Sequence, residues 1–169
     1  MKTVLLVRHA KSSWEDPMTI DFDRPLNERG KKDAPAMAKR IKEKGFEIDS
    51  LISSPAKRAK KTAKLFAEVF KYNEEKIIYK TELYHADPAT FYSVIEQASN
   101  NHESIAVFSH NPGITYFVNE LTEVKIDEVP TCGVFALKAE CSKWKDFKKA
   151  KKQFLFFDYP KAMDAVTVK

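Results

Sequence analysis

Two arginines and two histidines lie in three short segments whose other residues are mostly apolar or small. Arg8 and His9 follow the run TVLLV, Arg58 lies in SSPAKRAKKTA, and His110 lies in FSHNPG. An arginine guanidinium binds phosphate oxygens through parallel N–H donors and stays charged during phosphoryl transfer. A histidine is mostly neutral near pH 7 and can attack phosphorus to form a covalent intermediate. Together these residue types predict a site for a tetrahedral, doubly charged anion, with phosphate as the natural candidate.

The four residues receive different roles from their chemistry. His9, beside Arg8 at the end of an apolar run, is the predicted nucleophile. Arg8 and Arg58 are predicted to clamp the phosphate oxygens, and His110 to contact a phosphoryl oxygen and stabilise its developing charge.

The elements that would position these residues follow from the spacing of apolar side chains. Runs rich in Val, Ile, Leu and Phe predict strands at 3–8, 49–53, 76–79, 104–109, 133–139 and 153–158. Apolar residues three and four positions apart predict helices at 28–44, 56–70, 88–99 and 112–121. This alternation predicts an α/β fold, a three-layer sandwich whose mostly parallel central sheet is flanked by helices, with room for an antiparallel edge at the last two strands.

Each polar cluster follows the carboxyl end of a predicted strand: the first, the second and the fourth. Parallel strands end at one edge of a sheet, where open α/β sheets bind their ligands. The pairs Ser54-Pro55, Asp87-Pro88 and Asn111-Pro112 each place a favoured N-cap residue before proline, which predicts three helix starts. The first and last of these directly follow strands, so their free N–H groups would face the same edge.

The bulk composition bounds the class of protein. A length of 169 residues suits a single domain over 1–169, and 43% hydrophobic residues supply a core. The net charge of +5 favours an anionic partner only weakly. In the basic block 143–154, Trp144, Phe147 and Ala150 recur at intervals of three, which favours a solvated helix with one buried stripe over a nucleic-acid site.

Several kinds of site are disfavoured by what the sequence contains. The two cysteines, Cys132 and Cys141, have no CxxC or disulfide-framework spacing, and His85 and His102 read as surface or loop residues, so no metal and no cofactor is predicted. No nucleotide-binding glycine motif occurs among the four glycines. No apolar stretch is long enough for a membrane span, and the amino end does not resemble a signal peptide, so a cytoplasmic location with reduced thiols is expected.

The three segments also resemble a known family. VRHAKS, SSPAKRAKKTA and SHNPG resemble the motifs of the histidine phosphatase superfamily, the phosphoglycerate-mutase-like proteins, over residues 2–122. The short length, the opening RHAKSSW with a following DFDRPLNERG, and the SHNPG box look most like the SixA-type phosphohistidine phosphatases. The resemblance implies a phosphorylated nucleophile at His9, phosphate ligands at Arg8 and Arg58, and a second catalytic histidine at His110. This chain has Ala10 where the motif has Gly, and Ser109 where Gly often precedes the second His.

The general acid is less defined. Many relatives use a carboxylic acid to protonate a leaving oxygen, and Glu82 lies in about the corresponding region, with Asp87 as the alternative. A phosphohistidine substrate lowers the demand for an acid because imidazole leaves more readily than an alkoxide. The loop 11–24 either closes over substrate or is only a connection.

The expected function is therefore that of a phosphohistidine phosphatase acting on a phosphorylated signalling protein, such as a histidine phosphotransfer domain, with no nucleic-acid or membrane partner. The alternatives are a phosphatase of small phosphomonoesters or a mutase, a non-catalytic phosphoprotein-binding module, and a basic nucleic-acid binder.

Overall fold

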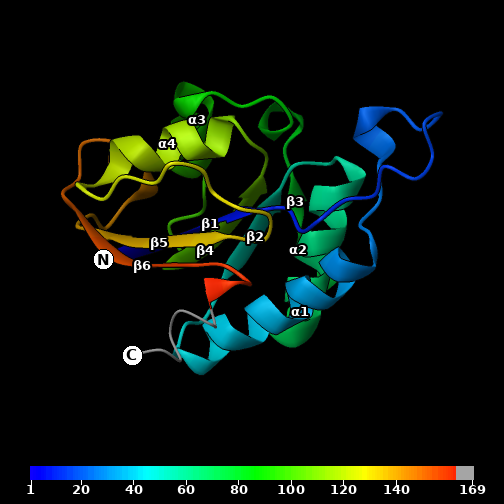
Figure 1. Cartoon of the computed structure of the whole chain (residues 1–169). Helices are drawn as coiled ribbons and strands as arrows, with labels where there is room; N and C mark the ends of the chain where they lie inside the picture. Colours follow the sequence, from blue (N-terminus) through cyan, green and yellow to red (C-terminus); the bar gives the residue numbers. More distant parts are fainter. Residues whose placement is uncertain (163–169) are drawn as a thin grey trace.

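The computed structural model describes residues 1–162, in which six strands form one sheet with α-helices on both faces (Figure 1). The strands are β1 (Lys2–Arg8), β2 (Ser50–Ser53), β3 (Ile78–Tyr79), β4 (Ser104–Ser109), β5 (Val134–Ala139) and β6 (Lys152–Asp158). The helices are α1 (Glu28–Glu43), α2 (Lys57–Val69), α3 (Pro88–Glu96) and α4 (Gly113–Leu121), with short 3₁₀ turns at Asp21–Asp23, Glu74–Lys76, Thr81–Leu83 and Trp144–Asp146. None of the described helices is long and apolar enough to cross a bilayer.

The sheet is mostly parallel. Its strand order is β3-β2-β4-β1-β5-β6. The pairs β2/β3, β2/β4 and β1/β4 are parallel, whereas β5 runs antiparallel to both β1 and β6. The predicted α/β class with a mostly parallel sheet is confirmed, and the antiparallel strand β5 lies one position inside the edge.

Two apolar cores cover the two faces of the sheet. Alternate residues of β1 point to opposite faces: Val4 and Leu6 pack with α3 and α4, and Leu5 and Val7 pack with α1 and α2. Figure 1 shows these two helix pairs on opposite sides of the strands. The predicted three-layer sandwich is therefore confirmed.

Only one of the three predicted helix caps forms. Asp87 caps α3 by accepting a hydrogen bond from the Thr90 N–H. Helix α2 instead has Ala56 at its N-cap and α4 has Pro112, so the predictions for Ser54 and Asn111 were wrong. Ser54 Oγ accepts from the Ala56 N–H, ahead of the first helical residue, and also contacts His110, whereas Asn111 donates to the Val129 carbonyl and accepts from Thr115.

The predicted helix over 143–154 was also wrong. This segment contains one 3₁₀ turn, Trp144–Asp146, and then enters β6 at Lys152. Trp144 and Phe147 are nonetheless buried, because the turn itself places both rings against the α3 and α4 side of the core. The spacing of three residues correctly predicted that Trp144 and Phe147 are buried, but the segment is a 3₁₀ turn followed by a strand and not a helix.

The long connection after β1 is closed at its base. Asn27 N–H donates to the Lys11 carbonyl, Ser13 N–H donates to the Pro25 carbonyl, and Ser12 pairs with Leu26 in an isolated antiparallel bridge. Gly30, in the first turn of α1, lies directly against the Lys11 backbone, where a Cβ atom would collide with the Lys11 carbonyl oxygen. Helix α1 therefore fixes both ends of the segment 11–27.

This close approach predicts that Gly30→Ala destabilises the protein, although alanine is about 1 kcal/mol better than glycine within a helix. We expect the free energy of unfolding, measured by urea denaturation, to fall by about 2 kcal/mol because two backbone segments must separate. Lys32→Ala, an exposed substitution on the same helix, is the control and should change little. A stabilised Gly30→Ala variant would contradict the close contact.

Candidate active site

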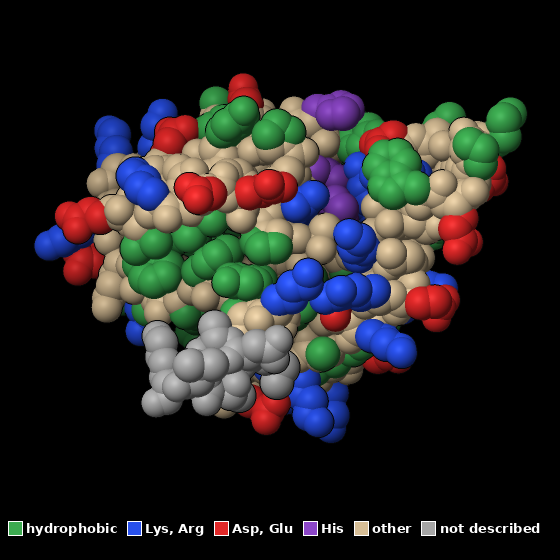
Figure 2. Space-filling model, in the orientation of Figure 1, with side chains coloured by type: hydrophobic (Ala, Val, Ile, Leu, Met, Phe, Trp, Pro, Cys, Tyr) green, Lys and Arg blue, Asp and Glu red, His purple; other side chains and the backbone are tan. Residues whose placement is uncertain are grey.

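The predicted polar clusters meet at the carboxyl edge of the sheet. His9 N–H donates to the Ser109 carbonyl at 3.1 Å, and Ser54 N–H donates to the Phe108 carbonyl at 3.0 Å, so the residues that follow β1, β2 and β4 are held side by side. They border a cavity of about 350 Å³, and histidine side chains are visible in this hollow beside basic side chains in Figure 2. The lining residues are Arg8, His9, Lys11, Ser12, Trp14, Asp21, Arg24, Arg58, Tyr84, His85, His110, Asn111 and Thr131.

His9 is buried and oriented by hydrogen bonds at both ring nitrogens. Its Nδ1 lies 2.8 Å from the Ala10 carbonyl oxygen, which can only accept, so Nδ1 carries the proton. Its Nε2 accepts a hydrogen bond from Arg58 Nε at 3.3 Å. Burial, and then the charges of Arg58 and Arg8, lower the pKa of His9 to about 3. At neutral pH the imidazole is therefore uncharged, and its Nε2 lone pair is directed at Arg58 Nε.

Arg58 links the nucleophile candidate to the loop over the cavity. Its NH1 donates to the Asp21 carbonyl at 2.6 Å and its NH2 donates to the Asp21 carboxylate at 3.0 Å. The side chain is almost fully buried, and Thr62 Oγ1 donates to its backbone carbonyl. The guanidinium that sequence reasoning assigned to phosphate is thus bound to an internal carboxylate in this structure.

Arg8 reaches the other side of the cavity. Its NH1 donates to the Val129 carbonyl at 2.9 Å and lies 3.5 Å from the Glu128 carboxylate. Its buried Nε has no hydrogen-bond partner within residues 1–162. Arg8 therefore has donors left for an anionic ligand.

His110 is packed against His9 and Ser54. The ring centroids of His9 and His110 are 5.2 Å apart, and Ser54 Oγ lies 2.7 Å from His110 Nε2. Burial, followed by the neighbouring His9 and Arg58, lowers the pKa of His110 well below its usual range. Its buried Nδ1 finds no partner in the described part of the chain, so one ring nitrogen remains for a ligand oxygen.

Ala10 is held by Thr62, the threonine of the SSPAKRAKKTA segment. Ala10 N–H donates to Thr62 Oγ1 at 3.0 Å, and the same hydroxyl donates to the Arg58 carbonyl at 2.8 Å. Ala10 is fully buried and its carbonyl orients His9. A methyl group at position 10 is therefore accommodated, and this pair connects the backbone after His9 to the helix that carries Arg58.

The loop 11–24 contributes functional groups whose arrangement the sequence did not reveal. The Asp21 carboxylate accepts hydrogen bonds from Tyr84 at 2.6 Å, from Arg58 and from Arg24 at 3.2 Å. Partial burial alone would raise the pKa of Asp21, but these hydrogen bonds outweigh it and hold the pKa below its usual range. Trp14 stacks on Arg24, whose guanidinium carbon lies 3.5 Å from the centroid of the Trp14 ring. Of the two readings left open for this loop, the one in which it covers the cavity agrees with these contacts.

The two carboxylates considered as general acids lie elsewhere. Glu82 is exposed on the 3₁₀ turn Thr81–Leu83 and does not line the cavity. Asp87 caps α3 through Thr90. Within the described part of the chain, Asp21 supplies the only carboxylate that lines the cavity.

The remaining sequence candidates add no second site. His85 is exposed at the rim, against Tyr84. Cys132 and Cys141 are free thiols. Within residues 1–162, no group of three or more His, Cys, Asp or Glu side chains has an arrangement suited to a metal ion.

The amino-acid sequence is similar to those of a known protein family. Residues 4–87 match the model of the histidine phosphatase superfamily (branch 1). The chain is 28% identical over 153 residues to an uncharacterised chloroplast protein of Arabidopsis thaliana, across 86% of this chain and 70% of that protein. It is 41% identical over 73 residues to a 2,3-bisphosphoglycerate-dependent phosphoglycerate mutase of Zymomonas mobilis, across 42% of this chain and 32% of the mutase.

Solved structures match nearly the whole chain. A protein of Agrobacterium tumefaciens assigned as the phosphohistidine phosphatase SixA superposes with a TM-score of 0.78 at 26% identity, over 94% of this chain and 98% of that one. The protein histidine phosphatase SixA in complex with tungstate superposes with a TM-score of 0.81 at 21% identity, over 95% of this chain and 99% of that one. The match to the mutase, by contrast, leaves most of that protein unaccounted for.

The buried neutral histidines predict a specific loss of stability in mild acid. His9 and His110 are neutral when folded, but they protonate near pH 6.5 when unfolded, so the unfolded state binds more protons below that pH. Each histidine should therefore cost about 1.4 kcal/mol of stability per pH unit between about pH 6.5 and 4.5. The free energy of unfolding, measured with urea at several pH values in this range, should fall less steeply with decreasing pH for His110→Gln than for the parent. An unchanged slope would mean that His110 is charged in the folded protein.

The link through Thr62 gives a second prediction. Thr62→Val keeps the side-chain shape but leaves the buried Ala10 N–H without an acceptor, so stability should fall by about 1–3 kcal/mol. Because the backbone beside His9 then shifts against Arg58, turnover of an aryl phosphate should fall by about ten- to a hundredfold. Thr62→Ser retains the hydroxyl and is the control for both measurements. A Thr62→Val variant that matches the serine variant would refute this positioning role.

Proposed function

The chain belongs to the histidine phosphatase superfamily, and we propose that it removes the phosphoryl group of phosphohistidine in a signalling protein through a covalent intermediate at His9. The observation that carries the proposal is the neutral His9, which lines the cavity together with Arg8 and Arg58 and whose Nε2 carries the unprotonated electron pair. A tetrahedral oxyanion suits such a cavity, since two guanidiniums can bind its oxygens while Nε2 approaches phosphorus.

The reaction follows from these positions. His9 Nε2 attacks phosphorus, the new N–P bond forms, and the bond to the leaving group breaks with its electron pair going to that group. Arg8 and Arg58 bind the equatorial oxygens, and His110 contacts one of them as charge redistributes. On binding, Arg58 exchanges both the Asp21 carboxylate and His9 Nε2 for the substrate oxygens, which frees the Nε2 electron pair. Water then attacks the phosphorylated His9 and releases phosphate with neutral imidazole.

Among the described residues that line the cavity, no carboxylic acid is suited to donate a proton, which supports a phosphohistidine substrate. Asp21 is the carboxyl group present among the described lining residues, and its lowered pKa keeps it ionised and unable to donate a proton at neutral pH. An alkoxide leaving group requires such a donor. A phosphoimidazole that is protonated at its other nitrogen leaves as neutral imidazole, so it requires none.

Exposed apolar side chains beside the cavity support a protein as the carrier of that phosphohistidine. Trp14, Met18 and Ile20 on the loop 11–24 are 75%, 86% and 65% exposed. Large exposed apolar groups near a binding site are typical of protein interfaces, in which tryptophan is enriched. A histidine phosphotransfer domain is a partner of this kind.

The proposal predicts that His9→Ala lowers kcat by about a thousandfold or more, both on a phosphohistidine protein and on an aryl phosphate. His102→Gln, which changes a histidine outside the cavity, is the matched control and should retain activity. The parent, quenched during turnover with radiolabelled substrate, should carry acid-labile, alkali-stable phosphate that His9→Ala lacks.

Other results would select the alternatives. An unaffected His9→Ala variant would refute the nucleophile. A preference for small phosphomonoesters over the phosphohistidine protein in kcat/KM would identify a phosphomonoesterase. If turnover is absent while tungstate raises the melting temperature, the domain is a phosphate-binding module.

A further inference from the structure

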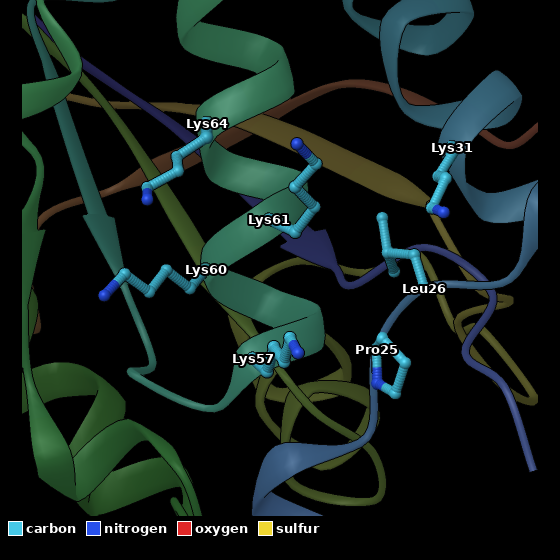
Figure 3. A pocket seen from close by; sticks show the side chains of 7 residues that line it. All are labelled: Pro25, Leu26, Lys31, Lys57, Lys60, Lys61 and Lys64. Carbon is cyan, nitrogen blue, oxygen red and sulfur yellow. The ribbon is translucent and has the colours of Figure 1, made fainter. Parts of the chain in front are cut away.

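A second cavity, of about 530 Å³, lies between the start of α1 and the exposed side of α2 (Figure 3). Its lining residues are Pro25, Leu26, Lys31, Lys57, Lys60, Lys61 and Lys64. We call it the lysine groove. Lys31 belongs to α1 and the other lysines to α2. Figure 3 shows Pro25 and Leu26 on the segment that leads into α1, with Lys60 and Lys64 extending to the far side of α2 from Leu26.

The lysines of the groove have almost no acidic partners in the protein. Lys31 lies 3.5 Å from the Glu28 carboxylate. For the other four, no carboxylate of residues 1–162 comes within 4.0 Å of the ammonium nitrogen, and Lys60 only approaches the Tyr79 ring. The groove is therefore a concentration of positive charge without internal compensation.

This arrangement is unfavourable for the protein alone. Lys57 and Lys60 lie in the first turn of α2, which contains no acidic residue, although the amino end of a helix favours negative charge. Lys57 and Lys61, and likewise Lys60 and Lys64, are four residues apart, where like charges repel. The helix loses stability from this placement, and an anionic partner in the groove would reverse that loss.

The chemistry of the lining favours carboxylates over a nucleic acid. Nucleic-acid sites typically combine arginine with aromatic side chains that stack on bases, and neither residue type lines this groove among the described residues. Four lysines over seven helical steps spread their charge along about 10 Å, and Pro25 and Leu26 provide apolar contacts. An extended segment with several Asp or Glu residues fits this pattern.

The groove adjoins the candidate active site through two elements. Arg24 lines the active-site cavity and the next residue, Pro25, lines the groove; Arg58 faces His9 while Lys57 faces the groove. We propose that the lysine groove binds an acidic segment of the phosphoprotein substrate while its phosphohistidine occupies the cavity. The identity of the partner as a substrate rests on the proposed function, whereas the binding of carboxylates in the groove does not.

Binding is tested first without catalysis, with a fluorescent polyglutamate peptide. The triple variant Lys57→Gln, Lys60→Gln, Lys61→Gln should bind it about tenfold more weakly than the parent. Lys145→Gln, Lys149→Gln, Lys151→Gln removes the same charge from exposed positions outside both cavities and should bind as the parent does. Equal affinity of the two triple variants would refute the site, whatever the protein's activity.

The second measurement tests the link to the substrate. Two phosphohistidine peptides that differ only in a flanking run of glutamates or glutamines are compared. The parent should show about a tenfold lower KM for the glutamate peptide, and the Lys57, Lys60 and Lys61 variant should lose this preference with unchanged kcat on an aryl phosphate. Loss of aryl phosphatase activity in His9→Ala tests the proposed function separately. Normal turnover without the glutamate preference overturns the groove proposal alone.

A third measurement tests whether the charges of the groove repel one another in the free protein, as the proposal assumes. Because these lysines repel one another and the helix dipole, the groove variant should melt about 2 °C or more above the parent, while the control variant should not. A groove variant that melts lower contradicts the proposal. Binding of duplex DNA in preference to polyglutamate would overturn it in favour of a nucleic-acid site.

Discussion

The hydrogen-bonded register of three parallel strands determines the geometry of the candidate site. The last two residues of β4 supply the carbonyls that hold His9 and Ser54, while β4 itself leads into His110. A shift of one residue between β1 and β4 would turn His9 to the other face of the sheet and exchange the two cores. Because both faces of β1 are apolar, this shift is opposed by the close packing of Leu5 and Val7 in one core and of Val4 and Leu6 in the other. The packing that stabilises the sheet and the placement of the nucleophile are therefore the same constraint.

Electrostatics then separates the roles of the groups at this edge. Three guanidiniums, those of Arg8, Arg24 and Arg58, surround two imidazoles that burial keeps neutral. The positive charge lies on the guanidiniums, whereas the imidazoles keep an unprotonated nitrogen, as the proposed mechanism requires of His9. Had the histidines been exposed beside fewer cations, a fraction of them would be protonated in mild acid, and a protonated His9 could not act as the proposed nucleophile. The same burial that maintains this division makes the folded state sensitive to acid.

The fold class, its layers and the meeting of Arg8, His9, Arg58 and His110 were predictable because each depends on local patterns and on one topological rule. Parallel strands end together, so residues after successive strands must approach one another. The network around Asp21 was not predictable, because Tyr84 and Asp21 are 63 residues apart and meet only through the path of a loop. The caps assigned to Ser54 and Asn111 were wrong since tertiary partners compete with the local helix end. Helix-capping rules were therefore least reliable for side chains that form hydrogen bonds within the site.

The contact between Arg58 and Asp21 also affects how tightly the cavity can hold an anion. The carboxylate already occupies the Arg58 guanidinium, so an anion that binds this group must displace it, and the free energy of binding is reduced by that of the Arg58–Asp21 ion pair. That reduction depends on how firmly the loop 11–24 holds Asp21, through Tyr84 and Arg24. Substitutions in the loop can therefore tune affinity and product release over a wide range without altering either histidine.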